Sequence, residues 1–231
     1  MKTTTKLSSE ERRAAIIQVA KKMFAEKGFD RTTTRELADS AGISEALLYK
    51  HFPTKEALFS AMQQSCQHQN DPAIERLKAL EPSTSTLVVM VHHFINKMAG
   101  RQPSRDEDDE ESVQFRLTIR SLMEDGEFAR LQIRSRSSCW IGKVVDCLKV
   151  AIAAGDAVNG PAPSELRAWF AHHMAVTLKI YLRPPEPIVD YKLPREKLVE
   201  YAVWFALRGM GVKDEAIKRY YNPKALALLV K

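Results

Sequence analysis

Residues 33–52 read TTRELADSAGISEALLYKHF, and this stretch decides the fold of the N-terminal part of the chain. It contains two short helical patterns that are separated by a break at Gly42. Thr33 and Glu36 form a Thr-x-x-Glu capping pattern at the start of the first helix, and Ser44 is suited to cap the second. Gly42 permits the positive φ that a tight turn between helices needs. The stretch therefore predicts a helix-turn-helix, a motif whose second helix enters a groove of DNA.

Further helices are expected on both sides of this stretch. Ser8 and Glu11 form another capping pattern, and the helix over residues 8–27 should end at Gly28. Thr54 should cap a longer helix after the helix-turn-helix. The apolar side chains that repeat at helical spacing predict one small shared core, made of Ile16, Ile17, Ala20, Phe24, Leu37, Ala38, Leu48 and Phe52.

The composition of the whole chain predicts a folded, helical protein. Hydrophobic residues make up 45% and charged residues 28% of the 231 positions, as in globular domains. Alternating β-branched stretches are nearly absent, and Asn159-Gly160 is followed by Pro161 rather than by a strand. The chain opens without the apolar segment of a signal peptide and has no uninterrupted run of about 18 apolar residues. We expect a cytoplasmic, all-α protein without a membrane partner, and the net charge of +6 favours a polyanionic one.

The chain should divide into two domains. Residues 9–69 form the expected three-helix helix-turn-helix domain, and residues 70–231 show long amphipathic patterns separated by Pro and Gly breakers, which predict a helical bundle. Residues 105–111, RDEDDEE, are expected to form an exposed loop because neighbouring carboxylates repel each other.

The region from about residue 9 to 62 resembles the TetR (tetracycline repressor) family of transcriptional regulators. The resemblance is carried by Ala20 and Phe24 before Gly28-Phe29, then TTTRELA at 32–38, AGIS at 41–44 and LYKHFPTKEAL at 48–58. The rest of the chain resembles the family only in architecture and length. The resemblance implies a homodimer that binds a double-stranded DNA operator through its helix-turn-helix and a small-molecule effector through its C-terminal domain, without a cofactor.

Carried over by position, the resemblance implies phosphate contacts from Thr33, Thr34, Tyr49 and Lys55. Hydroxyl groups and a lysine are suitable phosphate donors, and such contacts fix the register of a protein on DNA rather than its sequence preference. Thr33 can also act purely as a helix cap.

The outward side of the helix over 45–51 is expected to read base edges. Ser44 begins this helix, whose N-terminus should face the duplex, and His51 lies near the base-reading residues. Lys50 is suited to guanine O6 or N7, and Ala46 or Leu47 to a thymine methyl group. Glu45 stands where members of the family often carry a basic residue. It either accepts from cytosine N4 or pairs with Lys50 or another neighbour.

Two late helical patterns resemble the dimer-forming helices of the family. They cover residues 164–182 and 195–211, and each carries more apolar surface than one neighbour would cover. The alternative is a bundle within one chain. A two-fold dimer would place the recognition helices about 34 to 36 Å apart on a near-palindromic operator. The expected interface residues are Trp169, Phe170, Met174, Leu178, Leu198, Tyr201, Ala202 and Phe205.

The effector is expected among the middle helices, where apolar and aromatic side chains are suited to line a pocket. The candidate lining residues are Phe94, Met98, Phe115, Ile119, Met123, Phe128, Trp140 and Val144.

Two other classes of protein, an enzyme and a protein-interaction scaffold, fit the sequence less well. An enzyme or metal site is suggested only by His92-His93 and His172-His173, but adjacent helical residues diverge by about 100° and cannot readily chelate one ion. We therefore expect no catalysis and no bound metal. A helical protein-interaction scaffold that does not bind DNA would leave the joint occurrence of Thr34, Tyr49 and Lys55 unexplained.

Overall fold

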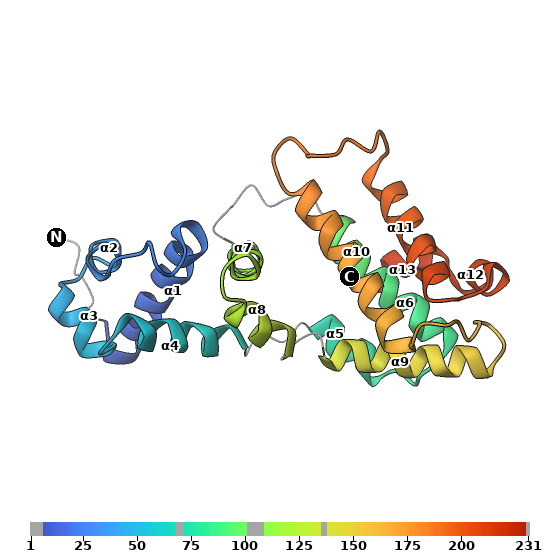
Figure 1. Cartoon of the computed structure of the whole chain (residues 1–231), viewed down its shortest axis with the longest axis horizontal. Coiled ribbons are helices and arrows are strands. Elements are labelled where there is room, and N and C mark those ends of the chain that lie inside the picture. Colours follow the sequence, from blue (N-terminus) through green and yellow to red (C-terminus); the bar gives the residue numbers. More distant parts are fainter. Residues whose placement is uncertain (1–6, 68–71, 101–108, 135–137, 230–231) are drawn as a thin grey trace. The chain divides into compact units, whose positions relative to one another are not determined.

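The structure is a computed structural model, and it describes residues 7–67, 72–100, 109–134 and 138–229. Helices dominate these ranges, which contain no β-strand and only an isolated bridge between Ala157 and Val212 (Figure 1). The expected all-α fold is confirmed. Contacts divide the chain into two compact units, and each is described by itself.

The N-terminal unit contains six of the labelled helices, two of which come from beyond residue 100. Its helices are α1 (Ser9–Lys27), α2 (Thr34–Ser40), α3 (Glu45–His51), α4 (Lys55–Gln67), α7 (Glu110–Met123) and α8 (Glu127–Gln132). The expected domain boundary lay at residue 70, and the contacts differ from that division by grouping α7 and α8 with the first four helices.

Local capping explains where the first helices begin and end. Ser8 and Glu11 form a reciprocal capping box at the start of α1, and Thr33 and Glu36 form another at the start of α2. The backbone N–H of Gly28 bonds to the last turn of α1 at a φ of 84°, a value that favours glycine. The predicted capping patterns are therefore confirmed.

Helices α7 and α8 complete the core of the N-terminal unit. Val113, Leu117 and Phe128 pack with the apolar residues of α1 to α4. The Lys21 side chain is nearly fully buried on α1, and its Nζ lies 2.7 Å from Glu110 Oε1 at the start of α7. A buried ammonium requires such a partner, so α7 is part of this unit by charge as well as by packing.

The acidic run at 105–111 is only partly described. Residues 105–108 lie outside the described ranges, so the loop prediction is untested there. For residues 109–111 it is wrong, because Asp109 Oδ1 accepts from the backbone N–H of Ser112 and caps α7. Glu110 and Glu111 occupy the first turn of α7, where carboxylates interact favourably with the positive end of the helix dipole.

The C-terminal unit is a larger helical bundle. It contains α5 (Pro72–Ala79), α6 (Thr84–Ile95), the π-helix η1 (Asn96–Gly100), α9 (Ser138–Ala153), α10 (Ser164–Leu182), α11 (Arg195–Gly209), α12 (Asp214–Tyr220) and α13 (Pro223–Leu229). α10 and α11 lie side by side, as Figure 1 shows, and each packs against α6. Arg167 is buried at the start of α10 and donates to the carbonyl oxygens of Val158 and Met210. This side chain ties the start of α10 to the end of α11.

Candidate functional site

The turn between α2 and α3 has the geometry of a helix-turn-helix. Gly42 has a φ of 64°, in the left-handed region. Ile43 donates its backbone N–H to the carbonyl oxygen of Ala38 at 3.0 Å and packs against the N-terminal core. Ser44 Oγ accepts from the backbone N–H of Leu47 at 3.2 Å and caps α3. These bonds fix the start of α3 relative to the end of α2.

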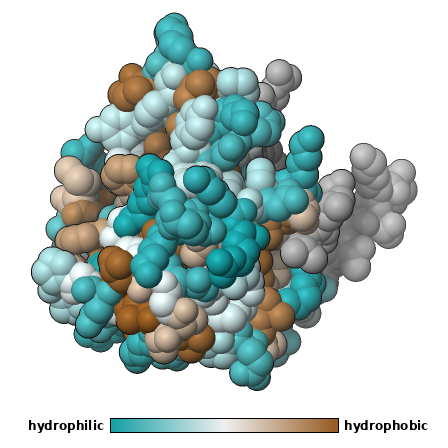
Figure 2. All heavy atoms as spheres, turned by 90° about the vertical axis from the view of Figure 1, so that its right-hand side faces the viewer, coloured by the Kyte–Doolittle hydropathy of each residue, from teal (hydrophilic) through white to brown (hydrophobic). Residues whose placement is uncertain are grey.

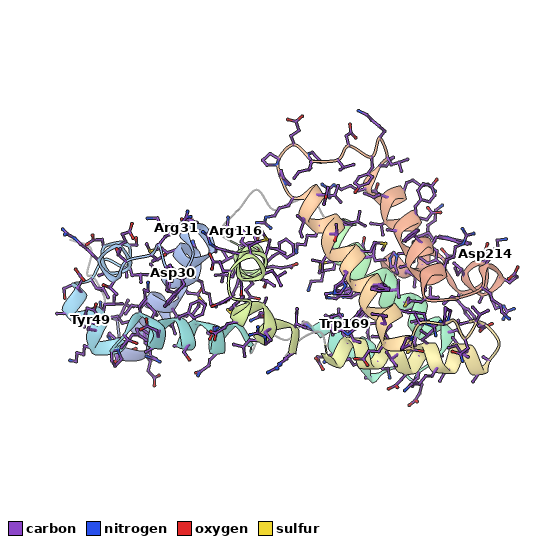
Figure 3. All side chains as sticks on the ribbon, in the orientation of Figure 1. Asp30, Arg31, Tyr49, Arg116, Trp169 and Asp214 are labelled. Atoms are coloured by element: carbon purple, nitrogen blue, oxygen red, sulfur yellow. The ribbon has the colours of Figure 1, made fainter. Side chains whose placement is uncertain are left out.

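A series of hydrogen bonds joins the outer sides of α2 and α3. The Tyr49 hydroxyl donates to Thr34 Oγ1 at 3.1 Å, and the Thr34 hydroxyl donates to Glu45 Oε2 at 3.3 Å. Figure 3 labels Tyr49 on α3, and 44% of this side chain is exposed. Of the alternatives open for Glu45, the structure shows pairing with a neighbour, which is Thr34. Three of the predicted DNA-contacting residues thus form one connected surface.

Lys55 and Thr33 both have partners inside the N-terminal unit. Lys55 Nζ donates to the carbonyl oxygens of Phe29 and Thr32, at 3.0 and 3.2 Å, and lies 4.2 Å from the centroid of the Phe29 ring. These two hydrogen bonds use two of the three donors of the Lys55 ammonium group, which also lies over the Phe29 ring. Thr33 Oγ1 accepts from the backbone N–H of Glu36 at 3.2 Å and caps α2. Both residues therefore also position the segment that leads into α2.

The remaining predicted base-reading residues lie along α3. Ala46 and Lys50 are exposed, whereas Leu47 and His51 are half-buried. On the opposite side of the helix, Leu48 is only 2% exposed and anchors α3 in the core, as expected. α3 therefore presents one outward side that carries a cation and apolar groups.

Arg13 belongs to this site although sequence reasoning did not single it out. Its Nη1 donates to the carbonyl oxygen of His51 at 3.0 Å, and its guanidinium carbon lies 4.2 Å from the centroid of the Phe52 ring. His51 is the last residue of α3, so Arg13 satisfies one of the free carbonyl groups at that helix end. The two residues are 38 positions apart, and no local pattern signals such a contact.

The Glu36 carboxylate links the end of α1 to the start of α2. It accepts from Lys27 Nζ at 2.7 Å and from the backbone N–H and hydroxyl of Thr33, each at 3.0 Å. The hydrogen bond from Lys27, followed by those from Thr33, lowers the pKa of Glu36 to about 2. The capping box of α2 therefore contains an ionised carboxylate at neutral pH.

The eight predicted effector-lining residues are divided equally between the two units. Phe115, Ile119, Met123 and Phe128 belong to the N-terminal unit, and Phe94, Met98, Trp140 and Val144 to the C-terminal unit. Met123 is 84% exposed, whereas Phe128 and Val144 are buried. The structure therefore does not gather the eight side chains within one unit.

In the C-terminal unit, part of the predicted set lies in an aromatic cluster. The ring of Phe94 is 5.5 Å from Trp140 and is stacked on His172 at 5.0 Å between centroids. Trp169, labelled on α10 in Figure 3, contacts both His172 and His173. His172 Nδ1 is buried and has no hydrogen-bond partner among the described residues. Burial, with a smaller contribution from His173, lowers the pKa of His172 to about 4.

Acidification should destabilise this cluster through His172. Its pKa in the folded chain, about 4, lies below the ordinary 6.5, so the unfolded chain binds a proton more readily. The contribution of the neutral ring is present above pH 6.5 and is lost as the pH falls toward 4. We expect a loss of about 1 to 2 kcal/mol in the free energy of unfolding at pH 5 relative to pH 7, discounted for partial exposure. Chemical denaturation at both pH values should show this loss in the wild type beyond the loss in His172→Phe, and equal losses would contradict it.

The predicted dimer helices have an inner and an outer side. Leu198 and Ala202 are buried in the core of their own unit, and Trp169, Met174 and Leu178 pack against that core. Aromatic side chains remain on the outer side: Phe170 is 59%, Tyr201 55% and Phe205 70% exposed. Figure 2 shows separate hydrophobic groups among hydrophilic ones on one face of the C-terminal unit. We call Phe170, Tyr201 and Phe205 the outer aromatic face.

Metal ligation and membrane insertion are two further properties that side chains and helices can reveal. Within the described ranges, no group of three or more His, Cys, Asp or Glu side chains is placed to hold a metal ion. None of the described helices combines the length and hydrophobicity that crossing a lipid bilayer requires.

The comparisons with known proteins agree with this anatomy, which is that of a helix-turn-helix protein with a larger helical unit. Residues 16–62 match the family model of bacterial regulatory proteins of the tetR family. A curated relative, the nucleoid occlusion factor SlmA of Vibrio campbellii, is 34% identical over 93 residues, which are 40% of this chain and 47% of the relative. The chain spans about half the length of the curated relatives that it matches first.

Solved structures share the fold over most of the chain. AibR in complex with isovaleryl coenzyme A and operator DNA has a TM-score of 0.61 at 18% identity, covering 84% of this chain and 97% of AibR. FadR from Bacillus subtilis in complex with stearoyl-CoA has a TM-score of 0.54 at 15% identity, covering 85% of this chain and 98% of FadR. At these identities the likeness concerns the fold alone. Residues 16–62 thus carry the match to the tetR family model, and the solved structures add a shared fold over most of the chain.

Proposed function

We propose that this chain is a ligand-responsive transcriptional regulator, acting as a repressor, that binds a near-palindromic operator as a homodimer. The observation that carries the proposal is the connected surface of Thr34, Glu45 and Tyr49 beside the outward side of α3. It lies within the segment that matches the family model. Hydroxyl groups at the start of α2 suit phosphate oxygens, and Lys50 on α3 suits a base edge.

The proposed dimer forms through the outer aromatic face of α10 and α11. Exposed aromatic side chains on two adjacent helices are typical of an interface between identical subunits. Two chains related by a two-fold axis would present two copies of α3 to a duplex at a spacing of about 34 to 36 Å.

The proposed sensor is the C-terminal unit, where Phe94, Trp140 and His172 form an aromatic cluster. The buried Nδ1 of His172, which has no partner among the described residues, would accept or donate one hydrogen bond to an effector. An effector changes DNA affinity only if it binds one conformation of the dimer better than the other. The solved AibR complex contains both an acyl-coenzyme A and operator DNA, so acyl-coenzyme A molecules belong in an effector screen by thermal stabilisation.

The DNA-binding proposal is tested by a mobility-shift titration against the duplex upstream of the protein's own gene. The logarithm of affinity should fall linearly with the logarithm of salt concentration, because cationic side chains displace counterions from phosphates. Tyr49→Phe removes one hydroxyl from the proposed surface and should weaken binding about threefold to tenfold. Tyr191→Phe, in the C-terminal unit, is the matched control and should leave binding unchanged. Failure to bind any duplex at low ionic strength would overturn the proposal.

A further inference from the structure

The N-terminal unit contains a cavity of about 310 Å³ that the proposed function does not use. Its walls come from α1, the segment between α1 and α2, α4, α7, α8 and the turn that joins α7 to α8. We call it the N-terminal cavity, and its lining residues are Phe24, Phe29, Glu56, Phe59, Ser60, Gln63, Leu117, Arg120, Ser121, Glu124, Asp125, Glu127 and Phe128. The volume lies at the lower end of the range for small-molecule sites.

Three phenylalanine rings form one wall of the N-terminal cavity. The ring centroids of Phe24 and Phe29 are 5.6 Å apart, those of Phe24 and Phe59 5.4 Å, and those of Phe29 and Phe59 4.9 Å. Such rings bury apolar groups, and their faces attract cations. One ring already receives a cation in this way, since Lys55 Nζ lies over Phe29.

The charged groups around the cavity are mostly acidic. Four carboxylates and one guanidinium line it, which gives the lining a net charge of −3 at neutral pH in a chain whose net charge is +6. Three of the carboxylates come from the short segment that contains Glu124, Asp125 and Glu127, and the fourth, Glu56, comes from α4. A cation would therefore be attracted into the cavity and an anion repelled.

Gln63 adds a hydrogen-bonding requirement. Its Nε2 is buried and has no hydrogen-bond partner within the described part of the chain. Because this nitrogen has almost no solvent-accessible surface, the Gln63 side chain must rotate toward the cavity before it can donate to an acceptor oxygen on a ligand, and that hydrogen bond would relieve the unfavourable unpaired amide.

We infer that the N-terminal cavity binds a small organic cation with an aromatic or alkyl body and a hydrogen-bond acceptor. The phenylalanine wall takes the body, the carboxylates take the charge, and Gln63 donates to the acceptor. This site is separate from the aromatic cluster of the C-terminal unit, and the regulation that it implies rests on the proposed DNA-binding function.

Arg120 connects the cavity to the DNA-binding helices. Its guanidinium donates to the carbonyl oxygens of Glu26 and Lys27, at 2.9 and 2.8 Å, and to Glu124 Oε1 at 3.0 Å. It therefore caps the C-terminal end of α1, and it lies so close to Gly28 that a Cβ atom there would be 2.6 Å from Arg120 Nε. A cation beside Glu124 competes with Arg120 for that carboxylate.

If the hydrogen bonds from Arg120 to the end of α1 weaken, the change is transmitted to the helix-turn-helix through Lys27. Lys27 Nζ contacts Glu36, whose carboxylate belongs to the capping box of α2. Occupation of the N-terminal cavity would thus change the position of α2, which carries Thr34, and thereby the affinity for DNA.

The test uses 2-phenoxyethylammonium, which carries a cation, an aromatic ring and an ether oxygen. Isothermal titration calorimetry of the full chain without DNA should show saturable binding of one probe molecule per chain. Phenoxyacetate has the same ring and ether oxygen with the opposite charge, and it should bind at least about tenfold more weakly.

Glu56→Gln and Glu127→Gln should each weaken binding of the cationic probe about threefold, and the double variant about tenfold. Glu10→Gln is the matched control on an exposed position of α1 outside the cavity and should bind like the wild type. Equal binding of the two probes, or an unchanged affinity in the double variant, would overturn the inference. These measurements contain no DNA, so their failure is distinguishable from failure of the proposed regulator function.

A second measurement tests the link through Arg120. A saturating concentration of 2-phenoxyethylammonium should change affinity for the operator at least about fivefold, a coupling typical of two linked sites. The glutamate-to-glutamine double variant should lose this response at the same probe concentration while it still binds DNA without the probe. A probe that binds and leaves DNA affinity unchanged would overturn the link.

Discussion

Lys50→Glu should weaken binding to the operator by at least about 100-fold. Lys50 is exposed on α3, on the side opposite the buried Leu48. A lysine that contacts a base edge contributes about 1 to 3 kcal/mol, and a dimer would lose that contact twice. The substituted carboxylate would also be repelled by nearby phosphates. Competitive mobility-shift titrations at constant salt measure the loss.

Lys218→Glu is the matched control for this charge reversal. Lys218 is exposed on α12 in the C-terminal unit, and its substitution changes the net charge of the chain by the same amount. Its affinity for the operator should stay within about twofold of the wild type. If both variants lose affinity equally, the effect comes from net charge rather than from α3, and the proposed recognition surface is wrong.

The start and end of each helix in the helix-turn-helix could be predicted because the signals are local. Ser8, Thr33 and Ser44 each bond to a backbone N–H within the next three residues, and the structure confirms all three caps. Gly42 has the positive φ that a turn of this kind needs. Such features depend on residues that are neighbours in the sequence, so a single sequence is enough to predict them.

Which helices belong to the N-terminal unit could not be predicted, because this depends on contacts between residues that are far apart in the sequence. Lys21 and Glu110 are 89 positions apart, and Arg120 bonds to carbonyl groups more than 90 positions earlier in the chain. Helical periodicity shows that α7 has an apolar side, but not which helix that side contacts. The N-terminal cavity is unpredictable from the sequence for the same reason, since its walls combine α1 and α4 with α7 and α8.

The effector residues show a related limit. Aromatic and apolar residues at helical spacing predict burial, and Phe128, Trp140 and Val144 are buried. The pattern does not predict which buried residues share one cluster, and the eight candidates fall into two units. Phe94 and Trp140 of the candidate set are in ring contact, and Phe94 is also stacked on His172. The His172-His173 pair in the sequence raises only a metal site, which helical geometry disfavours, and nothing local in the sequence indicates that His172 belongs to an aromatic cluster.

Phe205→Glu should convert the proposed dimer into monomers. Phe205 is 70% exposed on α11 and belongs to the outer aromatic face, so the substitution removes no contact from the core of its own chain. In a dimer the same position would bury two carboxylates, and losing a central aromatic anchor costs about 2 to 4 kcal/mol in each subunit. The dissociation constant of the dimer should rise at least about 1,000-fold. Sedimentation equilibrium over a range of protein concentrations measures it.

Met123→Glu provides the control for introducing a charge at an exposed apolar position. Met123 is 84% exposed at the end of α7 in the N-terminal unit, and its substitution should leave the dimer intact. The thermal unfolding temperature of each chain, measured at a concentration where the wild type is monomeric, should be similar for both variants. Monomeric Phe205→Glu should also bind the operator weakly, because only one α3 at a time can occupy its half-site. A Phe205→Glu protein that stays dimeric would place the interface elsewhere than the outer aromatic face, and the predicted spacing of the half-sites would lose its structural basis.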